Sequence, residues 1–208
     1  MKISERTYKK NEVITFSKIT GEFGGLSNMA SSYSLFVNET NIANTEILYQ
    51  ACRFPLFPKI QEEIISQSNP MEAKDISRKY IQYTRQDWDV VKFDVMRWCL
   101  QIKLLQNYDK FSSLLLSTDG NAIVEFSTKD NIWGALPVGK DLLKGKNALG
   151  RLLMEIRELY VKNSEGNEFV KPINIPAFLL FDHPINKAYN PEFVIEDLDD
   201  IYAIKKDK

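Results

Sequence analysis

Lys129–Gly134 (KDNIWG) and Gly145–Arg157 (GKNALGRLLMEIR) are the stretches from which the fold is inferred first. The first stretch joins an acid and a tryptophan to a glycine. From residue 149 onward, apolar residues recur at positions 149, 152, 153, 156, 159 and 160, and this spacing predicts a helix with one buried face. Asn147 is the expected N-cap of this helix.

The start of this helix is a candidate anion site. A helix N-terminus offers unpaired N–H groups and the positive end of the helix dipole, and Lys144, Gly145 and Lys146 precede it here. The combination suits a phosphate or pyrophosphate, although most helix starts bind only water. Lys146 and Asn147 are therefore candidate phosphate-binding residues.

Length and composition indicate one domain. The chain has 208 residues, 44% of them hydrophobic, which is enough for one substantial core but cramped for two. Its 27 Lys and Arg residues nearly balance 28 Asp and Glu residues, for a formal charge of −1. This balance disfavours a protein whose main activity is to grip a long phosphate backbone, but it leaves room for a local basic pocket.

Cysteine usage and the N-terminal sequence favour a cytoplasmic protein. Cys52 and Cys99 are isolated thiols with neither metal-ligand spacing nor a disulfide framework. Met1 is followed by a polar, charged segment, and no apolar window is long enough to cross a membrane. We expect a reduced setting, no membrane contact, no metal and no cofactor.

The pattern as a whole predicts an α+β fold, a single compact, mainly helical domain with a small β-sheet or hairpin. Val13–Phe16 and Ala122–Phe126 are expected as strands, and Tyr33–Ala43 as a hairpin. A polar stretch begins at residue 163. We therefore assign residues 1–162 to the domain and residues 163–208 to a C-terminal extension that packs on it or trails from it.

A second predicted helix carries a polar face. Thr45 is its expected N-cap, and Glu46, Gln50 and Arg53 then lie on one side, with Tyr49 beside them. One interpretation is an ordinary solvated face with an ion pair. The other is a site built from an acid, an amide and a guanidinium group.

Three blocks, found in this order, resemble the NADAR family, also called YbiA-like. They are Gly25–Asn28 (GLSN), Thr45–Phe54 (TEILYQACRF), and Asp130–Gly134 (DNIWG) with Gly145–Arg157. The resemblance runs from about Phe16 to Tyr160 and implies a compact, mainly helical α+β fold.

Riboflavin-pathway members of this family usually read Ser-Glu-His at the helix start and Lys-Phe at its end, whereas this chain has Thr45-Glu46-Ile47 and Arg53-Phe54. The stretches LYQACRFP (residues 48–55), SNPMEAK (residues 68–74) and RWCL (residues 97–100) are instead similar to the branch found beside DarT-type toxins, whose members remove ADP-ribose from guanine bases. This resemblance implies a hydrolase of an N-glycosidic bond to ribose. Its substrate would be ADP-ribosylated DNA or nucleotide, with a DarT-type toxin as its functional counterpart.

Cleavage of a ribose–nitrogen bond builds positive charge on the sugar, so it calls for a carboxylate, a nucleophile and phosphate-binding groups. We expect Glu46 to stabilise that charge or position water, and Asp130 to be a second carboxylate. Lys74 is either an amine nucleophile or a phosphate ligand. Tyr49 and Trp133 are expected to stack on a base, and the other substrate-binding candidates are Asn28, Gln50, Arg53, Gly134, Lys146 and Asn147.

Structural roles compete with several of these assignments. Asp130 can serve as a turn cap, Trp133 as a core residue and Asn28 as a left-handed turn residue. Three functions also compete for the whole protein: an ADP-ribosyl-guanine hydrolase, a glycosidase for a phosphoribosylamino-pyrimidine of riboflavin synthesis, and a non-catalytic ADP-ribose-binding module.

Overall fold

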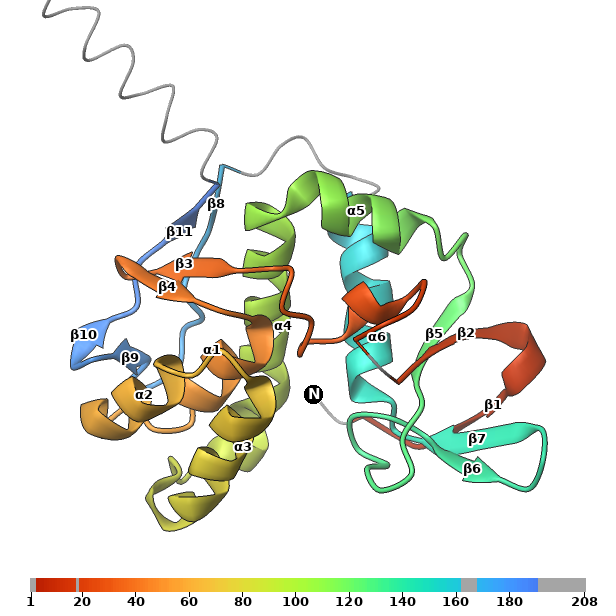
Figure 1. The fold of residues 1–208 in the computed structure, drawn as a ribbon, viewed down its shortest axis with the longest axis horizontal. Coiled ribbons are helices and arrows are strands. Elements are labelled where there is room, and N and C mark those ends of the chain that lie inside the picture. The colour runs from red at the N-terminus through yellow and green to blue at the C-terminus, as the bar shows by residue number, and fades with distance from the viewer. Residues whose placement is uncertain (1–2, 18, 162–167, 191–208) are drawn as a thin grey trace, which may run out of the picture.

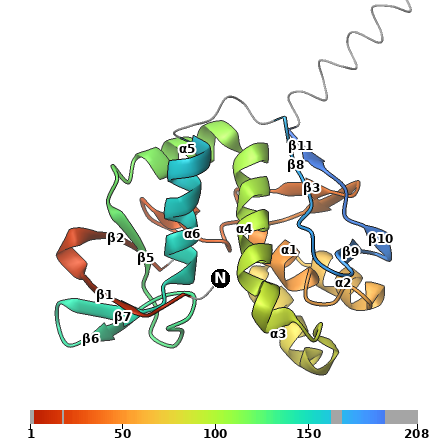
Figure 2. The same ribbon diagram turned by 180° about the vertical axis from the view of Figure 1, so that it is seen from behind.

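Two helices, α4 (Trp88–Gln106) and α6 (Ala148–Ile156), stand side by side at the centre of the computed structural model, which describes residues 3–17, 19–161 and 168–190 (Figure 1). The remaining helices gather on the α4 side, apart from α5 above, and a small sheet lies beyond α6. Figure 2 shows the same two halves from behind. The α+β, mainly helical architecture predicted from the sequence is confirmed.

The other helices and helical turns in the described part of the chain are α1 (Thr45–Ala51), α2 (Pro58–Ile65), α3 (Pro70–Lys79), α5 (Tyr108–Leu116), three 3₁₀ turns at Lys10–Glu12, Gly24–Leu26 and Ile81–Tyr83, and a π-helical turn at Arg157–Val161.

Its strands are β1 (Arg6–Lys9), β2 (Val13–Phe16), β3 (Leu35–Val37), β4 (Thr40–Ile42), β5 (Ala122–Glu125), β6 (Leu136–Val138), β7 (Leu142–Gly145), β8 (Phe169–Val170), β9 (Leu179–Leu180), β10 (His183–Pro184) and β11 (Ala188–Tyr189). Strand β7 pairs antiparallel with β1 and β6, whereas β2 and β5 pair in parallel, Val13 opposite Ala122 and Phe16 opposite Glu125.

The predicted hairpin is formed by β3 and β4. Asn38 and Glu39 form its turn with positive φ angles of 47° and 59°, which supplies the twist for which glycine is usually chosen. The chain leaves β4 directly into α1, so the hairpin sets the start of the helix that carries Glu46.

The N-cap of α1 differs from the prediction. Asn44 occupies the cap position, and its side-chain oxygen accepts a hydrogen bond from Ile47 N at 3.1 Å. Thr45, the expected cap, is the first helical residue and is buried. The cap lies one residue earlier because Asn is at least as good a cap as Thr and adopts the required extended backbone here.

The backbones of α6 and β5 lie in close contact. A β-carbon on Gly150 would lie well inside van der Waals distance of the Ile123 carbonyl oxygen. Asn147, at the start of α6, has a left-handed backbone, and its side chain donates to Ile123 O at 2.8 Å and accepts from Glu125 N at 3.0 Å. These contacts fix the end of β5, where Glu125 lies.

The described part of the expected C-terminal extension packs on the domain. Strands β8 and β11 contact α4, and Phe178, Leu180 and Ile185 are buried in the same core as the helices. No helix in the described ranges combines the length and apolar character that crossing a bilayer requires.

We predict that Gly150→Ala destabilises the protein by about 1–3 kcal/mol, because the added methyl group would have to push α6 away from the Ile123 backbone. Helix propensity alone predicts the opposite sign, a gain of up to about 1 kcal/mol. Urea denaturation of wild type and variant measures the difference.

Ser113→Ala, on the exposed side of α5, is the matched control and should change stability by no more than about 0.5 kcal/mol. A Gly150→Ala protein as stable as wild type would show that α6 does not need this close contact.

Candidate active site

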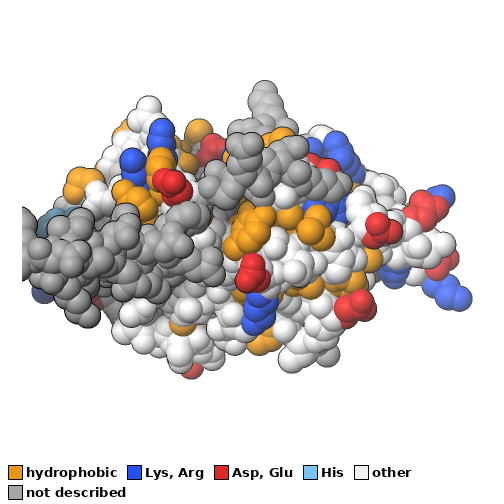
Figure 3. Space-filling model, turned by 90° about the horizontal axis from the view of Figure 1, so that it is seen from above, with side chains coloured by type: hydrophobic (Ala, Val, Ile, Leu, Met, Phe, Trp, Pro, Cys, Tyr) orange, Lys and Arg blue, Asp and Glu red, His pale blue; other side chains and the backbone are white. Residues whose placement is uncertain are grey.

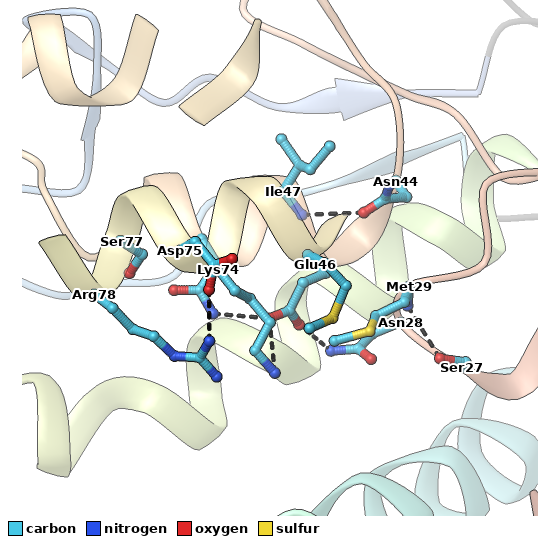
Figure 4. Close-up of polar contacts among 12 residues, drawn as sticks. Ser27, Asn28, Met29, Asn44, Glu46, Ile47, Lys74, Asp75, Ser77 and Arg78 are labelled. Atoms are coloured by element: carbon cyan, nitrogen blue, oxygen red, sulfur yellow. Dashed lines mark hydrogen bonds and ion pairs between the residues drawn. The ribbon is translucent and has the colours of Figure 1, made fainter. Parts of the chain in front are cut away.

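Glu46, in the first turn of α1, is the centre of a buried polar cluster. Its side chain is only 3% exposed. Asn28 Nδ2 donates to one carboxylate oxygen, and Gln50 Nε2 donates to the other at 2.8 Å. Lys74 Nζ, on α3, lies 3.8 Å from Glu46 Oε1 (Figure 4). Because the Lys74 side chain is 30% exposed, it links the cluster to solvent.

The surroundings of Glu46 act on its pKa in two directions. Burial is the larger influence and raises the pKa of this carboxyl group above its usual value. Lys74, the Gln50 hydrogen bond and the more distant Arg53 and Arg78 oppose the rise by favouring the ionised form. The result is a carboxylate that has a raised affinity for a proton and lies beside an amine.

A buried lysine holds the loop that delivers Asn28. Lys103 is completely buried, and its Nζ donates to the carbonyl oxygens of Gly25 at 2.6 Å and Ser27 at 3.0 Å. The rings of Tyr33 and Phe111 lie 4.2 Å from the same nitrogen, and burial lowers the Lys103 pKa well below its usual value.

The same loop is also tied to α1 directly, since Glu46 N donates to the carbonyl oxygen of Asn28 at 2.9 Å. Asn28 therefore meets Glu46 through both its backbone and its side chain. The left-handed turn role considered for Asn28 is wrong, because it is not among the residues with positive φ.

Arg53 contacts the cluster through the Gln50 side chain. Its Nη1 donates to Gln50 Oε1 at 3.3 Å and to Ser77 Oγ at 3.0 Å, while Nη2 donates to Thr84 Oγ1 at 3.2 Å. The guanidinium carbon also lies 5.3 Å from the centre of the Trp88 ring. Arg53 thus orients Gln50, and most of its donors are used within the protein.

Aromatic rings border the cluster. Tyr49 lies 4.9 Å from Trp88 and 5.5 Å from Trp133 between ring centres, and Trp133 also contacts Phe93 at 5.2 Å. Tyr49 is only 5% exposed, so the structure does not provide the open stacking face predicted for it. Trp133 is partly exposed and keeps that role as a prediction.

The Asp130 side chain caps a turn, which is the structural alternative considered for it. Its Oδ1 accepts hydrogen bonds from Ile132 N at 2.8 Å and Trp133 N at 2.9 Å, and the residue is exposed. This is the Asx-turn geometry that short acidic side chains favour. Its carboxylate nevertheless acts electrostatically on Glu125, which places it at the border of the cluster.

The prediction of free N–H groups at the start of α6 is wrong. Carbonyl oxygens of the 131–134 turn accept hydrogen bonds from these groups, as the following pairs show: Lys146 N to Asn131 O, Asn147 N to Gly134 O, Ala148 N to Ile132 O and Leu149 N to Trp133 O. The Asn147 side chain is also fully used and buried. Of the two predicted phosphate ligands, Lys146 and Asn147, Lys146 keeps this role as a prediction.

Gly134 has a packing role, and its binding role stays a prediction. A β-carbon at this position would collide with the carbonyl oxygen of Glu125. Together with Gly145 and Gly150, it lets three backbone segments approach one another around the end of β5.

Glu125 is a residue that the sequence reading missed. It is the last residue of β5, is partly buried, and no hydrogen-bond partner reaches its enclosed Oε2 within the described ranges. Burial, assisted by the negative charges of Asp130 and Glu46, raises its pKa to about 7, while Lys74 opposes the rise. The available signal was an acid next to the end of a predicted strand, five residues before Asp130.

The structure therefore brings together Asn28, Glu46, Gln50, Arg53 and Lys74 in one connected network, with Glu125 close enough to interact electrostatically. No three His, Cys, Asp or Glu side chains gather as a metal site within residues 3–17, 19–161 and 168–190.

The family model described as the NADAR domain matches residues 9–160, which is most of the chain. The chain belongs to the NADAR family. The N-glycosidase YbiA of Escherichia coli is 36% identical over 149 residues, covering 72% of this chain and 89% of that protein. The NMR structure of YbiA matches with a TM-score of 0.61 at 34% identity, over 73% of this chain and 86% of that one.

A second relative carries a different name. The riboflavin biosynthesis protein VVA0006 of Vibrio vulnificus is 32% identical over 146 residues, which cover 69% of this chain and 38% of that longer protein. Family membership thus points to chemistry at N-glycosyl bonds, while the relatives carry more than one functional name.

We predict that Glu125→Gln stabilises the protein at pH 8 relative to wild type and that the difference disappears near pH 4. A carboxyl group whose pKa is raised to about 7 binds its proton more tightly in the folded state, so wild type loses stability as pH rises from about 4.5 to 7. The neutral amide avoids this loss, which is at most about 3 kcal/mol. Urea denaturation across this pH range measures it.

The matched control is Glu62→Gln, an exposed acid on α2. Its stability difference from wild type should vary little with pH. Parallel pH curves for wild type and Glu125→Gln would mean that Glu125 is ionised normally.

Proposed function

We propose that this protein is an N-glycosidase that hydrolyses the bond between ribose and guanine in ADP-ribosylated nucleic acid. The observation that carries the proposal is the buried Glu46 carboxylate, held by Asn28 and Gln50 and paired with Lys74. A rigidly held negative charge favours a reaction that builds positive charge on a sugar. The N-glycosidase name of YbiA supports the same chemistry.

We assign Lys74 the role of nucleophile, with Glu46 as its base. The amine lies 3.8 Å from a carboxylate whose proton affinity burial raises, so Glu46 is placed to take the ammonium proton as the amine attacks C1′ of the ribose. Asn28 and Gln50 hold the carboxylate in the orientation that this transfer requires. Water then releases the sugar from the lysine.

Two positions favour the guanine substrate over a riboflavin intermediate, one directly after Glu46 and one just after the end of α1. Riboflavin-pathway members of the family carry His after the glutamate and Lys before the phenylalanine. Here the first position is Ile47, which is completely buried, and the second is Arg53, which is bonded to Gln50, Ser77 and Thr84. Neither position supplies the group that those members have.

The surface supports recognition of ADP-ribose itself more than of a long nucleic acid backbone. Lys and Arg side chains are interspersed with Asp and Glu on the face seen from above in Figure 3, in keeping with a net charge of −1. The proposed substrate is the product of a DarT-type toxin, and the protein would act as its antitoxin by restoring the unmodified base.

We predict that purified protein releases intact ADP-ribose from a DNA oligonucleotide modified on guanine, and that Glu46→Gln lowers the rate by at least about a hundredfold, because the amide cannot accept the Lys74 proton. Mass spectrometry of the oligonucleotide and of the released sugar reports the reaction. Glu62→Gln, exposed on α2, serves as the control for loss of an acid.

Two results would overturn this assignment. Turnover of a phosphoribosylamino-pyrimidine with no action on the oligonucleotide would identify the riboflavin-type glycosidase. Binding of ADP-ribose by both wild type and Glu46→Gln, with no turnover of either substrate, would identify a non-catalytic module.

We predict that Lys74→Arg is as inactive as Lys74→Ala, with a loss of at least about a hundredfold, because a guanidinium keeps the charge but is not a nucleophile at neutral pH. Borohydride reduction during turnover should trap a lysine–ribose adduct through its open-chain iminium form. Intact-mass spectrometry should find the adduct in wild type and not in Lys74→Arg. Activity of Lys74→Arg within about tenfold of wild type would instead give Lys74 the phosphate-ligand role.

A further inference from the structure

Glu125 comes from the opposite half of the fold to the Glu46 and Lys74 pair. It ends β5, on the sheet side of α6, whereas Glu46 and Lys74 come from α1 and α3 on the other side of the two central helices (Figures 1 and 2). The charges of both residues nevertheless act on it, so the three side chains share one region.

The backbone around Glu125 is fixed, whereas one oxygen of its carboxyl group has no hydrogen-bond partner in the described part of the chain. Its N–H donates to Asn147 Oδ1 at 3.0 Å, and its carbonyl oxygen accepts from Ala135 N at 2.8 Å. Oε2 is enclosed and unpartnered in the described part of the chain. A buried oxygen without a donor suits a protonated carboxyl group, since an ionised one would require hydrogen bonds.

The proposed reaction needs such a proton. When the bond between C1′ and the guanine nitrogen breaks, its electron pair stays on a nitrogen that becomes a far better leaving group once protonated. Neither of the other carboxylates is placed for this task. Glu46 already accepts hydrogen bonds from Asn28 and Gln50, and Asp130 is exposed and caps the turn before Trp133.

We propose that Glu125 is the general acid that protonates the leaving base, an inference that rests on the proposed N-glycosidase function. In the first step the Glu125 proton passes to the guanine nitrogen, the C1′–N bond breaks, and the Lys74 nitrogen bonds to C1′ as its proton passes to Glu46. In the second step the C1′–Lys74 bond breaks as water bonds to C1′ and gives a proton to Glu125, and Glu46 returns its proton to the amine.

The charged groups that face Glu125 set the pH at which this acid can work. Asp130 on the following turn and Glu46 on α1 disfavour its ionisation, whereas Lys74 on α3 favours it. A pKa of about 7 leaves a large fraction of Glu125 protonated at neutral pH. Activity should therefore fall as pH rises above about 7.

The test is single-turnover cleavage of the guanine-modified oligonucleotide at saturating enzyme between about pH 5.5 and 9. Wild type should show a falling alkaline limb. Glu125→Gln should be at least about a hundredfold slower at pH 6 and should lose this limb. Formate should restore part of the activity of Glu125→Ala, because a small carboxylic acid can supply the missing proton, and should not restore Glu46→Ala.

Asp130→Asn provides a second, opposite readout. The amide keeps the oxygen that caps Ile132 and Trp133 but removes a negative charge beside Glu125. Its alkaline limb should move to lower pH, a change that loss of structure alone would not produce. Circular dichroism and thermal melting of each variant confirm that it is folded.

The outcomes separate the two proposals. If wild type cleaves the oligonucleotide and Glu46→Gln does not, but Glu125→Gln keeps both the rate and the pH limb of wild type, the acid role is overturned and the proposed function stands. An enzyme without turnover of any N-glycosyl substrate overturns both. A slow Glu125→Gln with an unchanged limb would show that another group carries the proton.

Discussion

A carboxylate that is removed from water must be held by hydrogen bonds and opposite charge, and the arrangement of the helical half follows from this requirement at Glu46. Asn28 meets one oxygen because Lys103 fixes the loop before it, and Gln50 meets the other because Arg53 holds its amide. The helices α1 and α3 and the loop that carries Asn28 thus contribute polar groups to one buried point, and α4 supplies the lysine that holds this loop. Burying any one of these polar groups alone would cost free energy, and the hydrogen bonds and the ion pair between them offset that cost.

A different constraint governs the sheet half, where backbone meets backbone. Gly134, Gly145 and Gly150 have no β-carbon at the three places where the turn, the strand and the helix approach closely. The Asn147 side chain donates to one backbone group of β5 and accepts from another, as a neighbouring strand would. The first N–H groups of α6 donate to carbonyl oxygens of the 131–134 turn. The strand end that carries Glu125 is held in place by hydrogen bonds to Asn147 and Ala135.

Local patterns in the sequence predict local structure here and fail where distant backbone intervenes. The spacing of Glu46 and Gln50 places them on one face of α1, Arg53 lies just beyond the end of the helix and donates to Gln50, and β2 has the predicted bounds. The start of α6 looks like an anion site because Lys146 and Asn147 suit one, but its N–H partners come from a turn whose position no spacing reveals. Glu125 was missed for a related reason, because its raised pKa depends on burial and on charges from distant parts of the chain.

The parallel pairing of β2 with β5 also determines when the protein can be completed during synthesis. Val13 must wait for Ala122 to leave the ribosome before the two strands can join, whereas the helices between them have partners close in sequence. Non-local strand pairing of this kind forms late because a long loop has to close first. The helical half can therefore assemble early around Glu46, and the chain gains a working centre only in the last steps of folding, when the sheet half docks against it.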